Sequence, residues 1–155
     1  MAIGPDDTAF VLFGRLEEAA SRMLDAILPR IRAGDIPRTP QDLSRGSYFG
    51  GRKPEDGRIS WNASARAVFN LIRGVTRPYP GAFGFLGGRK VLIWWARPLE
   101  GPSLEPGAVA VSKGLVFIGT ASGVVMPLEI EVDGTVYKGD EVAGYFTAHE
   151  GERMT

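Results

Sequence analysis

The chain has 155 residues and no cysteine, which excludes disulfides, thiolate metal sites and cysteine nucleophiles. Its apolar content of 44% and charged content of 23% are those of a globular protein, and without a membrane-spanning apolar run or a signal-peptide pattern we expect a cytoplasmic protein with no membrane contact. The net charge is zero, yet residues 1–99 carry 15 Lys and Arg against 9 Asp and Glu, which suits an anionic ligand, whereas residues 100–155 carry 3 against 9.

A long amphipathic helix is predicted near the N-terminus. Residues 5–8 favour a helix start, with Asp6 and Asp7 as cap residues at the positive end of the helix dipole. Pro29 should weaken the last turn and Gly34 should close it. An apolar stripe recurs at three- and four-residue spacing, and it consists of Phe10, Phe13, Leu16, Ala20, Leu24, Ile27, Leu28 and Ile31.

Residues 35–61 form a long connection rich in Pro, Gly, Arg and Asp, and a loop of this length is functional or a linker. Tyr48 and Phe49 lie among four cations, which are Arg45, Arg52, Lys53 and Arg58. Guanidinium groups suit phosphate oxygens, and an aromatic ring stacks on a nucleobase. The alternative is that Phe49 and Trp61 hold the loop to the core while water solvates the charges.

A second helix is predicted over residues 63–73, with Asn62 or Ser60 as its cap. Its inward side chains should be Ala65, Val68, Phe69 and Ile72. Gly74 should end this helix, and Pro78 and Pro80 should prevent its resumption.

Short strands are predicted from residue 83 onward. Three pairs of strands flank glycine turns, with strands at 83–86 and 90–96, at 108–112 and 115–120, and at 124–132 and 135–137. Asp140 should cap a last helix that runs to Phe146. This pattern favours a small barrel or sandwich. Of the adjacent Trp94 and Trp95, one should point inward, and the outward ring is a stacking platform or is covered by the second helix or by a partner chain.

Two segments form a distinctive pair. Residues 48–61 read Tyr-Phe-Gly-Gly-Arg-Lys-Pro-Glu-Asp-Gly-Arg-Ile-Ser-Trp, and residues 73–83 contain Arg-Gly followed later by Pro-Tyr-Pro-Gly-Ala-Phe. Together they resemble formyltransferases that use formyl-tetrahydrofolate. The resemblance is above all to bacterial UDP-aminoarabinose formyltransferases and next to methionyl-tRNA formyltransferase, and it covers about residues 3–146.

The resemblance implies an α+β organisation. Residues 1–61 would be the tail end of a catalytic domain, consisting of a helix and a substrate-side loop. Residues 62–81 would be a connecting helix and Pro-Gly hinge, residues 82–146 a small OB-like open β-barrel, and residues 147–155 a polar tail. Because the loop lies on the acceptor side in this family, we expect Tyr48, Arg52 and Lys53 to bind substrate.

The catalytic segment of the family has no counterpart here. The resemblance implies an Asn-x-His-Pro motif and a later Asp, but no Asn-x-His occurs, and the single histidine is His149. We assign no catalytic residue and no metal ligand, and expect the chain alone to be inactive and to bind no cofactor. Formyl-tetrahydrofolate would be the donor in the complete enzyme. Glu129 and Glu131 are two residues apart and should share one face of a strand. Such a pair is either the carboxylate pair of a hydrolase or, more simply, two solvated side chains.

The expected function is part of a formyl transfer to the amine of a UDP-aminosugar. The alternatives are the C-terminal portion of a methionyl-tRNA formyltransferase and a non-catalytic OB-like binding module. We do not expect tRNA binding, because residues 82–155 carry 6 Lys and Arg against 9 Asp and Glu. The stripe of the first helix should pair with a second copy of the chain or dock on a catalytic half; the alternatives are that the helix folds back on the barrel or frays.

Overall fold

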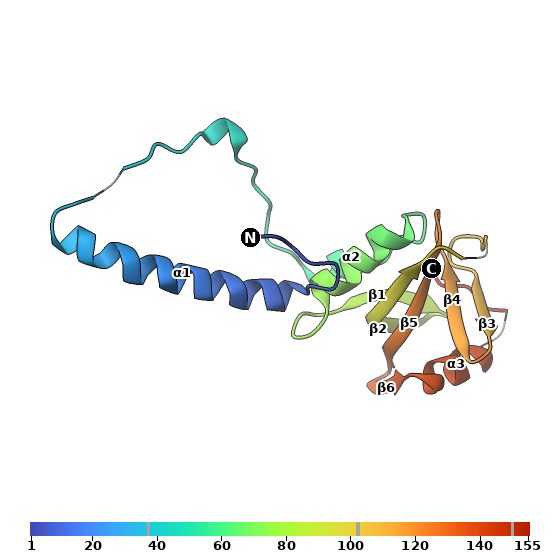
Figure 1. Cartoon of the computed structure of the whole chain (residues 1–155). Coiled ribbons are helices and arrows are strands. Elements are labelled where there is room, and N and C mark those ends of the chain that lie inside the picture. The colour runs from blue at the N-terminus through green and yellow to red at the C-terminus, as the bar shows by residue number, and fades with distance from the viewer. Residues whose placement is uncertain (37, 102, 150) are drawn as a thin grey trace.

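A long helix and a small β-sheet unit lie at opposite ends of the molecule (Figure 1). This computed structural model describes residues 1–36, 38–101, 103–149 and 151–155. The helical elements are α1 (Ala9–Arg32), α2 (Ala65–Val75) and α3 (Asp140–Thr147), with short 3₁₀ turns η1 (Leu43–Arg45) and η2 (Pro54–Gly57). In the described part of the chain, no helix is both long and apolar enough to cross a membrane.

Helix α1 begins where the sequence predicts, but its cap is Thr8. The Thr8 side chain accepts a hydrogen bond from the Val11 amide at 3.2 Å. Asp6 and Asp7 are therefore not the caps that we expected. Both carboxylates bind arginine side chains instead, Asp7 binding Arg15 at 2.6 Å and Asp6 binding a strand residue of the sheet unit.

The apolar stripe of α1 is uncovered. None of the residues of this helix is buried, and Phe10 retains 57% of its surface. Figure 1 shows α1 (blue) extending away from the sheet, so the helix does not fold back across it. Pro29 lies inside the helix, and Gly34 closes it as predicted, with its amide donating to the Ile31 carbonyl at 3.0 Å.

Helix α2 begins later and ends later than the sequence predicts. Its cap is Ser64, whose hydroxyl accepts from the Ala67 amide at 3.2 Å, and not Asn62 or Ser60. The backbone before Ala65 bonds to another segment and not to the helix, since the Trp61 and Ala63 carbonyls both accept from the Ala121 amide. The helix passes through Gly74 to Val75. Its predicted inward face is confirmed, since Ala65, Val68, Phe69 and Ile72 are all buried.

The six strands form one antiparallel sheet in the order β1-β2-β5-β4-β3, with β6 on β5. Their bounds are Ala82–Leu86 (β1), Arg89–Leu99 (β2), Val109–Ser112 (β3), Leu115–Gly119 (β4), Val124–Val132 (β5) and Thr135–Lys138 (β6). All three predicted hairpins are present. The α+β fold expected from the resemblance is therefore confirmed.

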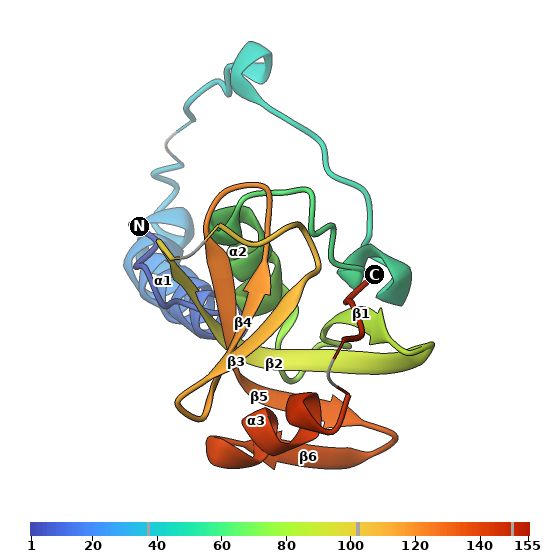
Figure 2. The ribbon, with the colours of Figure 1, turned by 90° about the vertical axis from the view of Figure 1, so that its right-hand side faces the viewer.

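The two ends of the sheet path are joined by the last residues of the chain. Met154 bridges Leu86 of β1, and Arg153 bridges Ala108 just before β3. Met154 is only 2% exposed, so residues 147–155, expected as a polar tail, contain a side chain of the core. Figure 2 shows the C-terminus beside β1. Helix α3 packs Val142 and Phe146 into the same core.

The structure decides three expectations for the barrel. The β2–β5 register shifts on both sides of Trp95, so the strict in-and-out alternation is wrong here. Trp94 is buried, and Trp95 packs edge-on against Phe69 of α2 with ring centroids 5.7 Å apart, so of the alternatives for this tryptophan pair the structure shows cover by the second helix. Helix α3 follows Gly139 as its N-cap residue, so Asp140 is the first helical residue and not the cap.

Candidate functional site

A cavity lies where the start of α1, the loop of residues 35–61 with its basic side chains, the end of α2 and the following hinge (residues 76–81) meet. We call it the junction pocket, and its volume is about 480 Å³. It is lined by Ala9, Arg52, Lys53, Pro54, Gly57, Gly74, Val75, Tyr79, Pro80 and Gly81. The pocket therefore draws on both of the distinctive segments, residues 48–61 and 73–83.

The two segments touch at a pair of glycines. A Cβ atom on Gly57 would lie 2.4 Å from the carbonyl oxygen of Gly81, which is closer than real Cβ contacts. Gly81 has a φ of +88°, and its own Cβ would lie 2.9 Å from the ring of Trp94. The contact continues into the barrel, where the Ile59 amide donates to the Phe83 carbonyl at 2.8 Å. Loop and hinge thus form one continuous wall.

The 3₁₀ turn η2 places the two cations at the pocket. Proline stands at the first position of this turn, and the Lys53 amide donates to the Asp56 carboxylate at 2.8 Å. The Asp56 amide donates back to the Lys53 carbonyl at 3.1 Å. The side chains of Arg52 and Lys53 are exposed, and neither forms an ion pair within the described residues. Their charges face water or a ligand.

The hinge contributes Tyr79, a residue of the second distinctive segment that was not among the expected site residues. The Tyr79 amide donates to the Thr76 carbonyl at 3.1 Å, and the Gly81 amide donates to the Val75 carbonyl at 2.9 Å. Tyr79 is one of the lining residues of the pocket and is 37% exposed. An aromatic residue between two prolines, directly after a helix, was the available signal for it.

Tyr48 is not part of the junction pocket. Of the three expected substrate-binding residues, the neighbours Arg52 and Lys53 both line the pocket, whereas Tyr48 lies on the loop outside the lining and is 94% exposed. Phe49 is 87% exposed, so the suggestion that it holds the loop to the core is wrong. The same suggestion is right for Trp61, which is buried.

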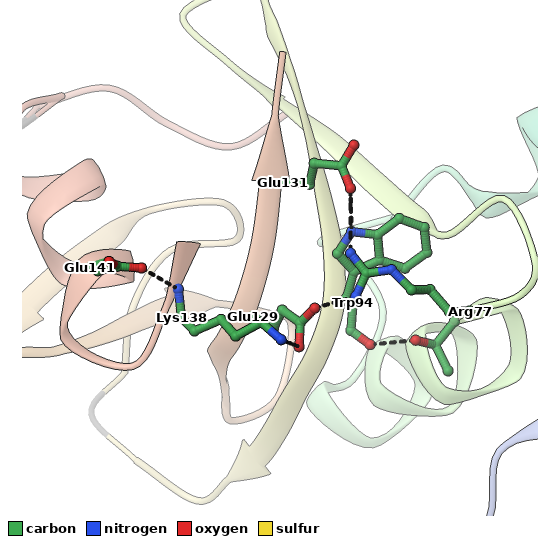
Figure 3. Close-up of polar contacts among 7 residues, drawn as sticks. Arg77, Trp94, Glu129, Glu131, Lys138 and Glu141 are labelled. Carbon is green, nitrogen blue, oxygen red and sulfur yellow. Dashed lines mark hydrogen bonds and ion pairs between the residues drawn. The ribbon is translucent and has the colours of Figure 1, made fainter. Parts of the chain in front are cut away.

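Glu129 and Glu131 form ion pairs with basic side chains. The Arg77 guanidinium binds both carboxylates, and the Lys138 ammonium lies 3.1 Å from Glu129 (Figure 3). Partial burial opposes ionisation, but the hydrogen bonds from Arg77 and Lys138 outweigh it and lower the pKa of Glu129. Because Arg77 binds both carboxylates and Lys138 also binds Glu129, this geometry does not suit a hydrolase pair, in which one carboxyl group must be free to donate a proton.

His149 and the N-terminal aspartates also have structural partners. The Nδ1 atom of His149 lies 2.8 Å from the Tyr145 carbonyl oxygen at the end of α3, and the two rings are 4.5 Å apart. The Gly4 amide and the Arg15 guanidinium lower the pKa of Asp7, and Arg73 binds the Asp7 carbonyl at 2.7 Å. The contacts of Asp7 dock the start of α1 on α2 beside the junction pocket.

Solved structures resemble this chain over most of its length. One is a multiply substituted variant of HypX from Aquifex aeolicus, with a TM-score of 0.66, 22% identity and 96% of this chain covered. Another is HypX from Aquifex aeolicus in complex with tetrahydrofolic acid, with a TM-score of 0.56, 26% identity and 80% covered. This chain spans 28% and 22% of those two chains, or about a quarter of their length.

A family model matches the part of the chain that contains the pocket wall and the barrel. It is described as the formyl transferase C-terminal domain, and it matches residues 52–143. This match begins at Arg52, includes η2, α2 and the hinge, and continues through all six strands into α3. The chain belongs to the formyl transferase C-terminal domain family.

Proposed function

We propose that this chain is the C-terminal portion of an enzyme that transfers a formyl group from formyl-tetrahydrofolate to the amine of a UDP-aminosugar. Its family places it with formyl transferases, and HypX, which it resembles, is known in complex with tetrahydrofolic acid. The observation that carries the proposal is the junction pocket, where the two distinctive segments meet beside Arg52 and Lys53. In this proposal the pocket lies on the acceptor side of the reaction.

The chemistry of the lining fits a sugar nucleotide. Arg52 offers a planar fork that binds two phosphate oxygens at once, and Lys53 adds a point charge. The ring of Tyr79 provides a flat face for a uracil or a pyranose. The volume of about 480 Å³ lies within the range of small-molecule sites. Tyr48, almost fully exposed on the same loop, is the residue we propose to close over the bound ligand.

The same proposal assigns no chemical step to this chain. Attack of an amine on the formyl carbon needs a base for the amine proton and donors for the tetrahedral oxyanion. The only histidine of the sequence, His149, is paired with Tyr145 at the end of α3, and the aspartates Asp6 and Asp7 are ion-paired. The chain would therefore hold the acceptor, while the catalytic groups and the formyl donor lie on another part of the enzyme.

The tRNA alternative has less support from the charges. A tRNA-binding barrel needs several Lys and Arg on its surface, because phosphate neutralisation provides most of the affinity. In the barrel of this chain acidic residues outnumber basic ones, and Arg89, Arg97 and Lys138 of the barrel form ion pairs with carboxylates, as does Arg77 of the hinge. We therefore propose a nucleotide-sized acceptor in preference to a polynucleotide.

Titration of UDP into the chain tests the proposal. We expect saturable binding that weakens with added salt, and at least a tenfold loss, about 1.4 kcal/mol, in Arg52→Met and in Lys53→Met. Arg45→Met is the matched control, since Arg45 lies on the same loop in η1 but outside the pocket lining. Absence of UDP binding, or an equal loss in the Arg45 control, would contradict the proposed site.

A further inference from the structure

Four side chains form a compact polar cluster on the sheet face next to the hinge. We call Arg77, Trp94, Glu129 and Glu131 the Arg77 cluster (Figure 3). The guanidinium carbon of Arg77 lies 4.2 Å from the centroid of the Trp94 ring, while its nitrogens bind Glu129 and Glu131. The Trp94 indole donates to Glu131 at 2.9 Å. Arg77 therefore contacts all three other members of the cluster.

The cluster holds the hinge at both of its ends. Before the turn, the Thr76 hydroxyl donates to the Trp94 carbonyl at 2.7 Å, and Arg77 covers one face of the ring. After the turn, Gly81 packs so closely on the Trp94 ring that a Cβ atom there would lie 2.9 Å from it. Tyr79 stands between these two anchor points. The position of Tyr79 in the pocket lining thus depends on the contacts of the hinge to Trp94.

The stability of the barrel comes mainly from its hydrophobic core and not from the Arg77 cluster. The hydrophobic core is built from residues such as Ile72, Val91, Ile93 and Ile130, and Trp94 is not a member of that cluster although it is buried. Arg77 is half-exposed, while the two carboxylates it binds are largely shielded from water. Hydrogen bonds between ionised groups are strong and directional in such a setting. Loss of Arg77 should therefore loosen the hinge more than the barrel.

We propose that Arg77 is a positioning residue for the junction pocket. It does not line the pocket and so does not touch the ligand; through Trp94 and the two glutamates it holds the hinge in the conformation that presents Tyr79. This inference rests on the proposed function for its ligand. It extends that function by making acceptor affinity depend on an ion-paired cluster outside the pocket lining.

The test compares UDP affinity with amide hydrogen exchange in the same variants. In Arg77→Met we expect about a tenfold weaker UDP binding, together with faster exchange of the Tyr79 and Gly81 amides and unchanged exchange along the β2–β5 ladder. Arg77→Lys should recover part of both effects, because an ammonium still reaches Glu129 but lacks the second arm of the fork. Arg89→Met, which removes an exposed ion pair on the barrel, is the control and should change neither.

The results separate the proposed binding of UDP from the proposed positioning role of Arg77. If the unchanged chain does not bind UDP, the proposed function fails, and hydrogen exchange alone still tests whether Arg77 holds the hinge. Wild-type exchange of the Tyr79 and Gly81 amides in Arg77→Met would overturn the positioning role. Equally faster exchange throughout the barrel, or a loosened hinge with full UDP affinity, would also overturn it, because Arg77 would then act only on stability.

Discussion

Gly57 and Gly81 are the residues whose contact brings two distant segments into one wall. Because the obstacle to a side chain on Gly57 is a backbone oxygen, the clash cannot be relieved by a rotamer change. Gly74, which lines the same pocket from within α2, has open space around its missing Cβ. Gly57 and Gly74 therefore give opposite expectations for the same substitution.

Gly57→Ala should destabilise the protein by about 1–3 kcal/mol, because the loop and the hinge must separate to admit the methyl group. Gly74→Ala should stabilise it by about 0.5–1 kcal/mol, since alanine is the better helix former in an unobstructed helical position. Urea denaturation of both variants checks the pair. Equal stability of the Gly57→Ala variant and the unchanged chain would mean that the two segments are not in close contact.

Glu129 gives a prediction on pH. Its pKa in the folded protein is below the ordinary value of 4.5, since bonds from Arg77 and Lys138 outweigh the effect of burial. A lowered folded-state pKa adds stability that is fully present above 4.5 and is lost as the pH falls through the folded-state value. Glu129→Gln should therefore be less stable than the unchanged chain at pH 7, and the difference should shrink in acid.

Urea denaturation of the Glu129→Gln variant at pH 7 and at pH 3 measures this difference. The exposed Glu100 provides a control, as Glu100→Gln should change stability little at either pH. A stability difference for Glu129→Gln that is as large at pH 3 as at pH 7 would show that the ion pairs are not its source.

At the scale of elements, periodicity located the helices and strands well, while tertiary contacts moved their ends. Helix α2 starts at Ala65 because the backbone of residues 61–63 bonds to the loop before β5. The apolar spacing of α2 could not show that these backbone carbonyl groups bond to that loop and not within the helix. Likewise, the spacing of β2 predicted alternation, and the bulge at Trp95 became visible only with the β5 partner in place.

Helix α1 is the element whose apolar stripe remains uncovered in the structure. The stripe runs along about 32 Å of the helix and is largely exposed, and large exposed apolar patches are sites of association. We expect the isolated chain to self-associate through α1. The pair Phe13→Glu and Leu24→Glu, made together, should yield monomers, because each change places a charge within the stripe.

Analytical ultracentrifugation over a concentration series checks the state of each chain. The matched control is Glu18→Gln with Arg22→Gln, a pair outside the stripe that forms only an exposed ion pair with itself. If the unchanged chain is a monomer, self-association is contradicted. We would then propose that the stripe docks on a catalytic half.

For the molecule as a whole, the expected outcome is binding without turnover. With formyl-tetrahydrofolate and a UDP-aminosugar, the purified chain should show no formylated product above a buffer blank, since no base and oxyanion donors are assigned to it. Chromatographic detection of the formylated sugar nucleotide provides the measurement. Product formation that increases in proportion to protein concentration would overturn this view and would place catalytic groups within the chain.

Sequence by itself determined the α+β fold class, the three hairpins, the inward face of α2 and the membership of a formyl transferase family, because local periodicity, turn residues and motif spacing carry that information. Only the tertiary structure decided that Arg52 and Lys53 share a pocket with Tyr79 while Tyr48 lies outside it. It also decided that Met154 closes the barrel and that Glu129 and Glu131 hold Arg77. These contacts join residues far apart in the sequence, so they depend on how packed elements meet and not on any pattern along the chain.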